Sequence, residues 1–367
     1  MKVLMVVSNL HIAGGVARFA MTYYKNIDHN KIAMDFILYD NSDPFNEYVD
    51  EIKKHGDHIY CLPPLKNINE HLKSCRNILK RGKYDVIHDN SLINTIPLMR
   101  EAKKTKIPVR VLHAHATRLG QNKYKELRNK FFLPILKKSI NTNAACSVEA
   151  AKCLFGNDKY TLLHNAIHGE DYFFDKEKRN EFRKQIGASD KKIVLTVGRV
   201  AEQKNPYFAI DVIAEAIKRN NNIFYIWVGD GPLINNLKDY VDSLHLSEYI
   251  QFVGNKTNLK RYYLAADCFF LPSLFEGLPV SGVEAQASGI PCIFSDTITK
   301  ELSYIDAVKY VSLSKSEIYW AEQLLDYLNK DIDRNKGINY FQLSSFSDKN
   351  AGERLEKFYK NELGNTE

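Results

Sequence analysis

Residues 193–231 read IVLTVGRVAEQKNPYFAIDVIAEAIKRNNNIFYIWVGDG and are the clearest guide to the architecture. The stretch begins with the apolar run Ile193–Val197 and ends with a second apolar run, Phe224–Val228. Neither run alternates polar and apolar residues, as is typical of parallel strands that are covered on both faces. The amphipathic segment between them is long enough for the helix that connects two parallel strands. The stretch therefore predicts a βαβ unit.

Similar apolar runs, separated by amphipathic helical stretches, recur on both sides of this unit. Before a connection near residues 163–171 we expect strands at Val3–Val7, Met34–Leu38, His58–Leu62, Asp85–His88, Val109–His113 and Asn141–Cys146. After residue 231 we expect strands at Ile250–Val253, Cys268–Leu271 and Cys292–Phe294. The pattern predicts an α/β fold with two consecutive Rossmann-like domains, each built on a doubly wound parallel sheet.

Length and composition agree with two soluble domains. The 367 residues are too many for one ordinary core. Hydrophobic residues make up 44% and charged residues 26%, which is typical of globular proteins. The formal net charge of +7 favours anionic partners, but it is too small to indicate nucleic acid.

Cysteine spacing and hydropathy predict a cytoplasmic protein. The six cysteines include no Cys-x-x-Cys pair and lie mostly in apolar surroundings, which favours free, buried thiols in a reducing compartment. The run Val3–Val7 is too short for a signal peptide, and no stretch approaches the roughly 18 to 20 apolar residues that span a bilayer. We expect any membrane contact to be peripheral, on the inner face of the cell membrane.

Two loops that follow predicted strands carry groups suited to an anion. Gly14 and Gly15 open a helix after the first strand, where backbone amides can approach a phosphate or a sugar; a simple tight turn is an equal alternative. Arg199 and Lys204 lie five residues apart in the loop after Ile193–Val197, so both can reach one diphosphate. The alternative is a solvated loop with two exposed cations.

The segment 272–289, PSLFEGLPVSGVEAQASG, is the most informative about function. Its two carboxylates, Glu276 and Glu284, lie eight positions apart, the first in a glycine-containing loop and the second inside a helix. The start of that helix favours a phosphate, and the carboxylates can accept hydrogen bonds from hydroxyls on either side of it. Two solvated surface glutamates are the alternative. The apolar neighbours of Glu284 argue against that alternative, because a charge in apolar surroundings needs a partner.

In combination these motifs resemble the retaining glycosyltransferases of family four, which have the GT-B fold. The resemblance spans essentially the whole chain and is strongest to bacterial capsule and exopolysaccharide members. Asn165-Ala166-Ile167 stands where that family has an Asn-Gly linker, and Asn205 stands where a glycine often follows the lysine. The resemblance implies two Rossmann-like domains that face each other across a cleft. It assigns residues 1–168 and the returning C-terminal helix, 346–367, to the acceptor domain, and residues 169–345 to the donor domain.

The resemblance also implies a role for each site residue. Arg199 and Lys204 would bind the donor diphosphate, Glu284 the nucleotide ribose, and Glu276 the transferred sugar. Backbone groups at Gly14, Gly15, Val253, Leu278 and Val280 would complete the donor site. The family often has one histidine near the donor sugar in the loop after the strand Val109–His113, where this chain has two, His113 and His115. We favour His115 because it lies further past the strand; His113 would then lie in the core or behind the site. The nucleotide sugar is a co-substrate, so no separate cofactor is expected. No metal is expected either, because no Asp-x-Asp motif ends a strand.

The expected activity is transfer of a sugar, with retention at the anomeric carbon, from a UDP-sugar to a saccharide acceptor. The resemblance implies a lipid-linked acceptor in capsule or exopolysaccharide synthesis. Two alternatives are a nucleotide-sugar epimerase and a non-catalytic sugar- or nucleotide-binding protein. The two glutamates together with the Arg199–Lys204 pair favour transfer.

Residues 118–138 raise a further hypothesis, contact with an anionic membrane surface. The segment contains seven basic residues and one acidic residue, Glu126. Its apolar residues recur at helical spacing: Tyr124, Leu127, Phe131, Ile135 and Leu136. A basic face and an apolar face can therefore coexist on one helix, bent near Pro134. The alternative is an ordinary connecting helix whose apolar stripe packs on the sheet.

Overall fold

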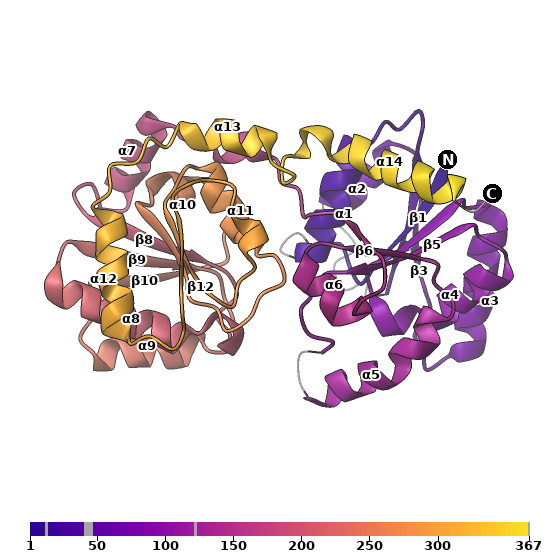
Figure 1. The fold of residues 1–367 in the computed structure, drawn as a ribbon, viewed down its shortest axis with the longest axis horizontal. Helices are drawn as coiled ribbons and strands as arrows, with labels where there is room; N and C mark the ends of the chain where they lie inside the picture. Colours follow the sequence, from indigo (N-terminus) through magenta and orange to yellow (C-terminus); the bar gives the residue numbers. More distant parts are fainter. Residues whose placement is uncertain (12–13, 40–46, 121–122, 366–367) are drawn as a thin grey trace. The chain divides into compact units, whose positions relative to one another are not determined.

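The computed structural model describes residues 1–11, 14–39, 47–120 and 123–365. The chain divides into two compact units (Figure 1). The N-terminal unit comprises Met1–Ala166 and Asp348–Glu367, and the C-terminal unit comprises Ile167–Ser347. The first junction falls inside the Asn165–Ile167 segment, and both junctions lie two residues from the boundaries expected from the sequence.

The N-terminal unit is a parallel sheet of seven strands in the order β3-β2-β1-β4-β5-β6-β7. The strands are β1 (Lys2–Val7), β2 (Ala33–Leu38), β3 (Ile59–Cys61), β4 (Val86–Asp89), β5 (Val109–Ala114), β6 (Thr142–Ala145) and β7 (Thr161–Leu162). Its helices are α1 (Gly15–Asn26), α2 (Glu47–Lys54), α3 (Ile68–Gly82), α4 (Ile96–Lys104), α5 (Lys123–Lys137), α6 (Val148–Phe155) and α14 (Ala351–Gly364). The strand order reverses direction between β1 and β4, which is the topological switch point.

The C-terminal unit is a second parallel sheet, with six strands in the order β10-β9-β8-β11-β12-β13. The strands are β8 (Lys192–Val197), β9 (Ile223–Val228), β10 (Ile250–Gly254), β11 (Cys268–Leu271), β12 (Cys292–Ser295) and β13 (Val308–Val311). Its helices are α7 (Lys176–Gln185), α8 (Pro206–Arg219), α9 (Ile234–Ser243), α10 (Lys260–Ala265), α11 (Val280–Ala287), α12 (Glu317–Leu328) and α13 (Lys336–Leu343). Its switch point lies between β8 and β11.

Two Rossmann-like domains are therefore confirmed, and each central strand is buried as its composition predicts. Residues 3–7 of β1 and 193–195 of β8 have no exposed surface. The sequence missed β7 and β13 because both are short edge strands. Thr161–Leu162 has only two residues, and Val308–Val311 is half-buried over three of its four positions, so neither forms a continuous apolar run.

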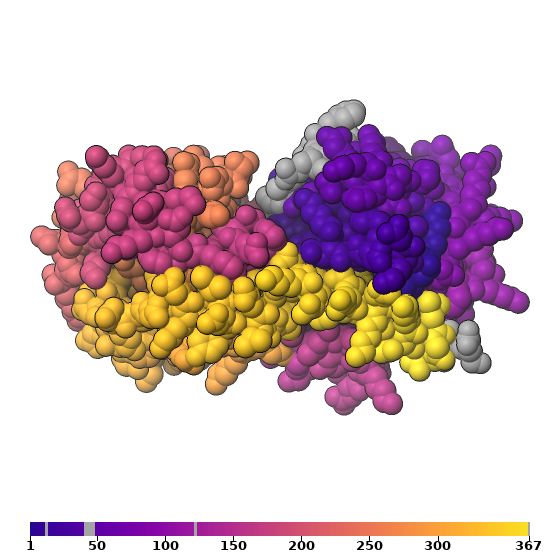
Figure 2. Space-filling model, turned by 90° about the horizontal axis from the view of Figure 1, so that it is seen from above, coloured from indigo at the N-terminus to yellow at the C-terminus, as the bar shows by residue number. Residues whose placement is uncertain are grey.

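The C-terminal helix α14 packs within the N-terminal unit, against α1 (Figures 1 and 2). Leu355, Phe358 and Tyr359 are buried on its inner face. A Cβ at Gly352 would lie 1.7 Å from the Asn26 carbonyl oxygen, so a glycine is needed for this close approach. The return of the final helix to the first domain is therefore confirmed.

Two further sequence expectations can be compared with the structure. In the part of the chain that the structure describes, no helix is both long enough and apolar enough to cross a membrane. All six cysteines are free, and four of them are buried. The expectation of uniformly buried thiols was wrong for Cys61, which is exposed at the end of the edge strand β3.

Candidate functional site

The loops after β8 and β11 meet at the carboxyl edge of the C-terminal sheet. The Leu274 amide donates to the Gln203 carbonyl at 2.8 Å, and the Gln203 side chain donates to the Phe275 carbonyl at 3.1 Å. Lys204 Nζ lies 2.6 Å from Glu276 Oε1. The two segments that the sequence singled out are thus joined at the switch point, where α/β proteins bind ligands, by residues 72 apart at Lys204 and Glu276.

The Lys204–Glu276 ion pair is shielded from solvent. The side chains are 12% and 8% exposed, and Gln203 Nε2 donates to the second Glu276 oxygen at 3.2 Å. A Cβ at Gly198 would lie 2.8 Å from Lys204 Cε, so this glycine leaves the space that the lysine side chain crosses. Asn205 adopts the left-handed conformation, with φ of 53°. Asparagine tolerates that conformation, which explains how it can replace the glycine often found there.

Arg199 differs from Lys204 in having no anchoring partner. Its side chain is exposed, and the structure shows no hydrogen bond or ion pair for it with any described residue. The backbone around it is nevertheless tightly packed. A Cβ at Gly229 would lie 2.1 Å from the Gly198 carbonyl oxygen, and one at Gly231 would lie 2.2 Å from that of Val200. The turn after β9 therefore holds the Arg199 loop through backbone contacts that require glycine.

Glu284 has the partners that a buried carboxylate needs. It has no exposed surface, and it accepts hydrogen bonds from the hydroxyls of Tyr172 at 2.9 Å and Tyr263 at 2.6 Å. Tyr172 belongs to the short helix Gly169–Tyr172, and Tyr263 belongs to α10. Sequence reasoning missed both tyrosines, because no motif links them to Glu284 and the fold alone brings them together.

The remaining donor-site candidates of the C-terminal unit lie at the same sheet edge. Leu278 is buried in the loop after β11, and Val253 is half-buried next to the end of β10. Val280 is the first residue of α11, and the preceding Pro279 provides no side-chain cap. The Gly282 amide already donates to the Pro279 carbonyl at 2.9 Å, which leaves the amides of Val280 and Ser281 for an anion, with the helix dipole adding to the attraction.

The N-terminal unit presents a different set of groups at its own switch point. Gly14 is the N-cap of α1 and its amide donates to the His11 carbonyl at 2.8 Å. Gly15 begins the helix, and a Cβ there would meet open space. The intervening residues of this loop, 12 and 13, lie outside the described residues. The α1 N-cap, like that of α11, makes no side-chain hydrogen bond to the first turn.

Three histidines form a chain behind this edge. His88 Nδ1 is 2.7 Å from the Tyr359 hydroxyl, and His88 Nε2 is 2.9 Å from His113 Nδ1. The rings of His113 and His115 stack with centroids 4.1 Å apart. His113 is fully buried, whereas His115 is half-buried and its Nε2 is 2.7 Å from Asn90 Oδ1. The structure thus places His113 in the core and His115 at the accessible end.

Burial keeps this cluster uncharged at neutral pH. Desolvation lowers the pKa of His88 and of His115 to about 3, and it lowers the pKa of His113 well below its usual value. Desolvation also raises the pKa of the adjacent Asp89 carboxyl to about 7, against the opposing hydrogen bonds from Thr95 and Ser91. Sequence reasoning missed Asn90 and His88, although a polar residue directly after β4 was a usable signal.

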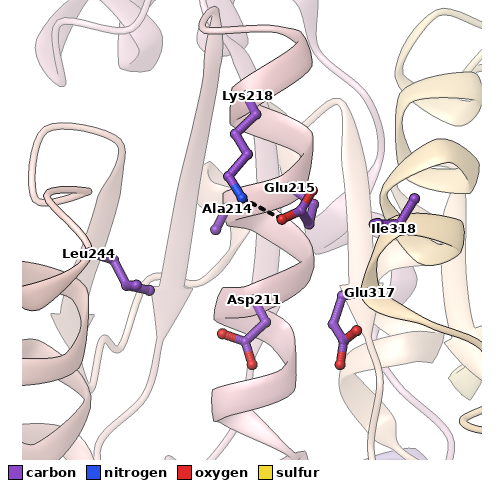
Figure 3. Close-up of a pocket in the computed structure, with 7 residues that line it drawn as sticks. All are labelled: Asp211, Ala214, Glu215, Lys218, Leu244, Glu317 and Ile318. Carbon is purple, nitrogen blue, oxygen red and sulfur yellow. Dashed lines mark hydrogen bonds and ion pairs between the residues drawn. The ribbon is translucent and has the colours of Figure 1, made fainter.

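A pocket on the helical face of the C-terminal unit contains none of these groups (Figure 3). It is lined by residues of α8 and α12 together with Leu244. The Lys218 ammonium pairs with Glu215 there, and none of the lining residues has a buried polar atom that lacks a hydrogen-bond partner. The pocket is therefore not the candidate site.

Helix α5 carries the apolar residues of the 118–138 segment on its exposed side. Tyr124 is 78% exposed, Leu127 71% and Phe131 72%, whereas Leu136 is buried. The expected alternative, in which the whole stripe packs on the sheet, is therefore wrong for these three residues. Lys130 pairs with Glu126 at 2.8 Å, and the other basic side chains flank the exposed stripe.

Comparison with known proteins places the chain in a family. A family profile described as "Glycosyl transferases group 1" matches residues 178–342. EpsF of Bacillus subtilis strain 168, which carries the name of a glycosyltransferase, is 30% identical over 380 aligned positions that cover 95% of this chain and 98% of EpsF. The chain belongs to the group 1 glycosyltransferases. This glycosyltransferase is thus a transferase enzyme, and the epimerase and the non-catalytic alternatives are set aside.

Two further likenesses describe the relatives of this glycosyltransferase. A protein of Escherichia coli named UDP-Gal:alpha-D-GlcNAc-diphosphoundecaprenol alpha-1,3-galactosyltransferase is 26% identical over 369 positions, covering 92% of each chain. HepE of Anabaena, crystallised with UDP and with UDP-glucose, matches with a TM-score of 0.78 and 14% identity. That match covers 98% of this chain and all of HepE, and at this identity it shows the fold.

Proposed function

We propose that this glycosyltransferase moves a sugar, with retention, from a UDP-sugar to a lipid-linked saccharide in capsule or exopolysaccharide synthesis. The observation that carries the proposal is the contact of Lys204 with Glu276 at the switch point of the C-terminal sheet, in the loop that also carries the exposed Arg199. One exposed cation, one shielded cation and one carboxylate are carried by the loops at this edge, and the loop with the carboxylate leads directly into α11. These are the groups that a sugar diphosphate requires.

The charges of this site suit the departure of a diphosphate. Negative charge grows on the leaving diphosphate, and Arg199 with the amides of α11 can stabilise it as the bond to the sugar breaks. Lys204 is held by Glu276 in the unliganded protein, so the lysine is already oriented when the donor arrives. No reorganisation of this side chain is then needed during the reaction, which is the condition under which electrostatic stabilisation is most effective.

The two glutamates are proposed to hold opposite ends of the donor. We propose that the Glu276 carboxylate, which pairs with Lys204 and accepts from Gln203, also accepts hydrogen bonds from the sugar that the diphosphate carries. Glu284 lies on α11 and would accept from the ribose hydroxyls. The Tyr172 and Tyr263 hydroxyls each donate to one oxygen of this carboxylate, so we propose that a ribose hydroxyl replaces the half-buried Tyr172 hydroxyl.

The comparisons support the substrate classes in this proposal. The HepE structures hold UDP and UDP-glucose, which makes a UDP-sugar the first donor to test. The E. coli relative is named for a diphosphoundecaprenol-linked saccharide acceptor and an alpha linkage, which favours a lipid-linked acceptor and retention. We propose His115 as a contact of the sugar because it is the accessible end of the histidine chain.

A donor screen tests the proposal directly. The purified chain is incubated with a panel of UDP-, GDP- and dTDP-sugars, and release of free nucleotide is measured with and without lipid-linked saccharide acceptors. We expect one UDP-sugar to be consumed faster when an acceptor is present. Proton NMR of the product then gives the anomeric configuration, and an inverted product or a preference for GDP-sugars would contradict the proposal.

We also propose that α5 binds the anionic surface in which a lipid-linked acceptor lies. Its exposed apolar stripe of Tyr124, Leu127 and Phe131 is flanked by basic residues, which is the pattern of helices that lie in a membrane interface. Each basic residue near an anionic surface contributes about 1 kcal/mol, and salt screens the attraction.

Vesicle sedimentation tests this surface. We expect binding to anionic but not to neutral vesicles, and loss of binding at high salt. Replacing Lys123, Lys125, Arg128 and Lys130 with glutamine should abolish it without changing donor hydrolysis. The matched control replaces four exposed basic residues at α3, which are Lys73, Lys80, Arg81 and Lys83. Equal binding by both variants and the wild type would contradict the proposal.

A further inference from the structure

Asn90 lies at the switch point of the N-terminal sheet, directly after β4. It is 7% exposed, and its backbone amide donates to the Val6 carbonyl of the neighbouring strand β1 at 3.0 Å. Its side chain reaches His115, which follows the next strand, β5. A single buried asparagine thus connects three adjacent strands of the sheet at its ligand-binding edge.

The surroundings of Asn90 determine which way its amide points. The side-chain nitrogen faces three acceptors, the Val6 carbonyl at 3.1 Å, the Met5 sulfur at 3.1 Å and the His88 carbonyl at 3.4 Å. A carboxamide oxygen turned toward these groups would meet only acceptors. Oδ1 therefore points the other way, toward His115 Nε2 at 2.7 Å. Because this oxygen can only accept, Nε2 must carry the proton.

The other ring nitrogen of His115 is left without a proton. Burial lowers the pKa of His115 to about 3, so the ring is neutral near pH 7 and carries one proton. Nδ1 makes no hydrogen bond to any described residue, and it is not among the buried unpaired atoms. The stacked His113 ring and the edge of Phe19, with centroids 4.9 Å away, hold the ring plane. Nδ1 is thus an oriented acceptor.

We propose that Asn90 is a positioning residue that holds His115 as the Nε2–H tautomer, so that Nδ1 accepts a hydrogen bond from a neutral sugar hydroxyl. The inference rests on the proposed function only in placing His115 on the sugar. The inference also predicts a donor preference: the site favours sugars that present a hydroxyl group to His115 Nδ1. A sugar with a carboxylate there, such as a uronic acid, would set acceptor against acceptor.

The titratable groups around His115 do not oppose this assignment. His88 and His113 lie behind it, both neutral because they are buried, and Tyr359 of α14 contacts only the far end of the chain at His88. The Asp89 carboxyl accepts from the Thr95 hydroxyl and the Ser91 amide. The structure shows no ion pair between His115 and a carboxylate of the described residues.

The tautomer is measured on the unliganded full chain by long-range nitrogen–proton NMR. Subtracting the spectrum of His115→Gln identifies the His115 signals among those of the 11 histidines. We expect a neutral Nε2–H ring at pH 7 in the wild type, and a mixture of tautomers in Asn90→Ala. An Nδ1–H ring or a charged ring in the wild type would overturn the inference and leave the proposed transfer intact.

Kinetics then test whether the tautomer is used. In Asn90→Asp one carboxylate oxygen faces His115 Nε2 and favours the charged ring, whose Nδ1 carries a proton and cannot accept. The other oxygen replaces the amide nitrogen beside the Val6 and His88 carbonyls, so thermal unfolding first establishes that this variant is folded. We expect kcat of this variant to fall about tenfold per pH unit on the acid side and to recover at high pH, while wild type stays flat. Asn30→Asp, on an exposed loop, is the charge-matched control. A wild-type pH profile in Asn90→Asp would overturn the inference, whereas a wild-type chain with no transfer activity would overturn only the proposed function.

Discussion

The two units present different chemistry at the same place in the same kind of sheet. The loops at the switch point of the C-terminal sheet carry two basic side chains, Arg199 and Lys204, and one carboxylate, Glu276. At the same edge of the N-terminal sheet, Asn90 follows the switch-point strand β4 and His115 follows its neighbour β5; the two are joined by a hydrogen bond and uncharged. Both sheets are parallel, and in both the loops after the two strands at the switch point are brought together.

This difference shows what the fold contributes and what the side chains contribute. Strand order creates a ligand-binding edge in each unit, whatever residues occupy it. Burial then determines which groups can remain charged. In the C-terminal unit the Glu276 carboxylate pairs with Lys204 and offsets the loss of hydration around the lysine, whereas in the N-terminal unit the buried histidines pair with no carboxylate of the described residues and stay neutral. One edge suits a diphosphate, and the other suits hydroxyl groups.

The largest expected effect is the fall in sugar transfer when the two basic residues at the edge of the C-terminal sheet, here called the charged edge, are replaced. Replacing both Arg199 and Lys204 with alanine should raise the barrier for sugar transfer by about 2 to 4 kcal/mol, because both cations are proposed to stabilise the leaving diphosphate. That corresponds to a loss of roughly 30- to 1,000-fold in kcat/KM. The matched control is Lys218→Ala with Arg219→Ala, which removes the same two charges from the exposed end of α8.

Thermal unfolding of both double variants shows whether either change disturbs the fold. If the Arg199–Lys204 variant is folded and retains turnover close to that of the control, the charged edge is not the donor site. The contrast between the two units would then lose its functional meaning.

An intermediate effect should separate the two glutamates. Glu276→Gln should lower kcat more than it weakens affinity for UDP, because this carboxylate is proposed to contact the sugar that reacts. Glu284→Gln should chiefly raise the KM for the donor and the Kd for free UDP. Calorimetric titration with UDP and initial-rate kinetics give the two quantities independently. Normal UDP affinity in both variants would show that this division of roles is wrong.

The smallest effect concerns the stability of the N-terminal unit in acid, which depends on the uncharged histidines His88, His113 and His115, here called the neutral edge. In the unfolded chain a histidine takes up a proton near pH 6.5, whereas buried His88, His113 and His115 do so only far below that value. Between pH 6.5 and those lower values the unfolded state binds more protons, so stability falls as pH falls. Each such histidine contributes up to about 1.4 kcal/mol per pH unit. Asp89 acts in the opposite direction, because its raised pKa adds stability as pH falls from about 7 toward 4.

Lowering the pH from 7 to 5 should therefore destabilise the N-terminal unit more than the C-terminal unit. Both tryptophans, Trp227 and Trp320, lie in the C-terminal unit, so their fluorescence reports on that unit. Peptide-resolved hydrogen exchange reports on the N-terminal unit. His113→Asn should reduce the acid sensitivity of the N-terminal unit. Equal acid sensitivity of the two units would contradict the account of a neutral edge maintained by burial.

Much of the fold and part of the site could be predicted from the sequence. The apolar runs identified every central strand, because strands covered on both faces exclude polar residues. The edge strands β7 and β13 were missed because they lack such runs. The loops that carry Arg199, Lys204 and Glu276 were located by their place after strands, and the structure brings Lys204 and Glu276 into contact.

The sequence by itself determined the two parallel sheets and the sheet edges at which ligands can bind, because apolar patterning and strand-to-loop position are local properties. Only the tertiary structure decided that Tyr172 and Tyr263 hold Glu284, that Asn90 orients His115, and that Tyr359 meets His88. These partners lie between 21 and 271 residues apart in the chain. Their hydrogen bonds depend on burial and on strand order, which bring together groups that no spacing in the sequence relates.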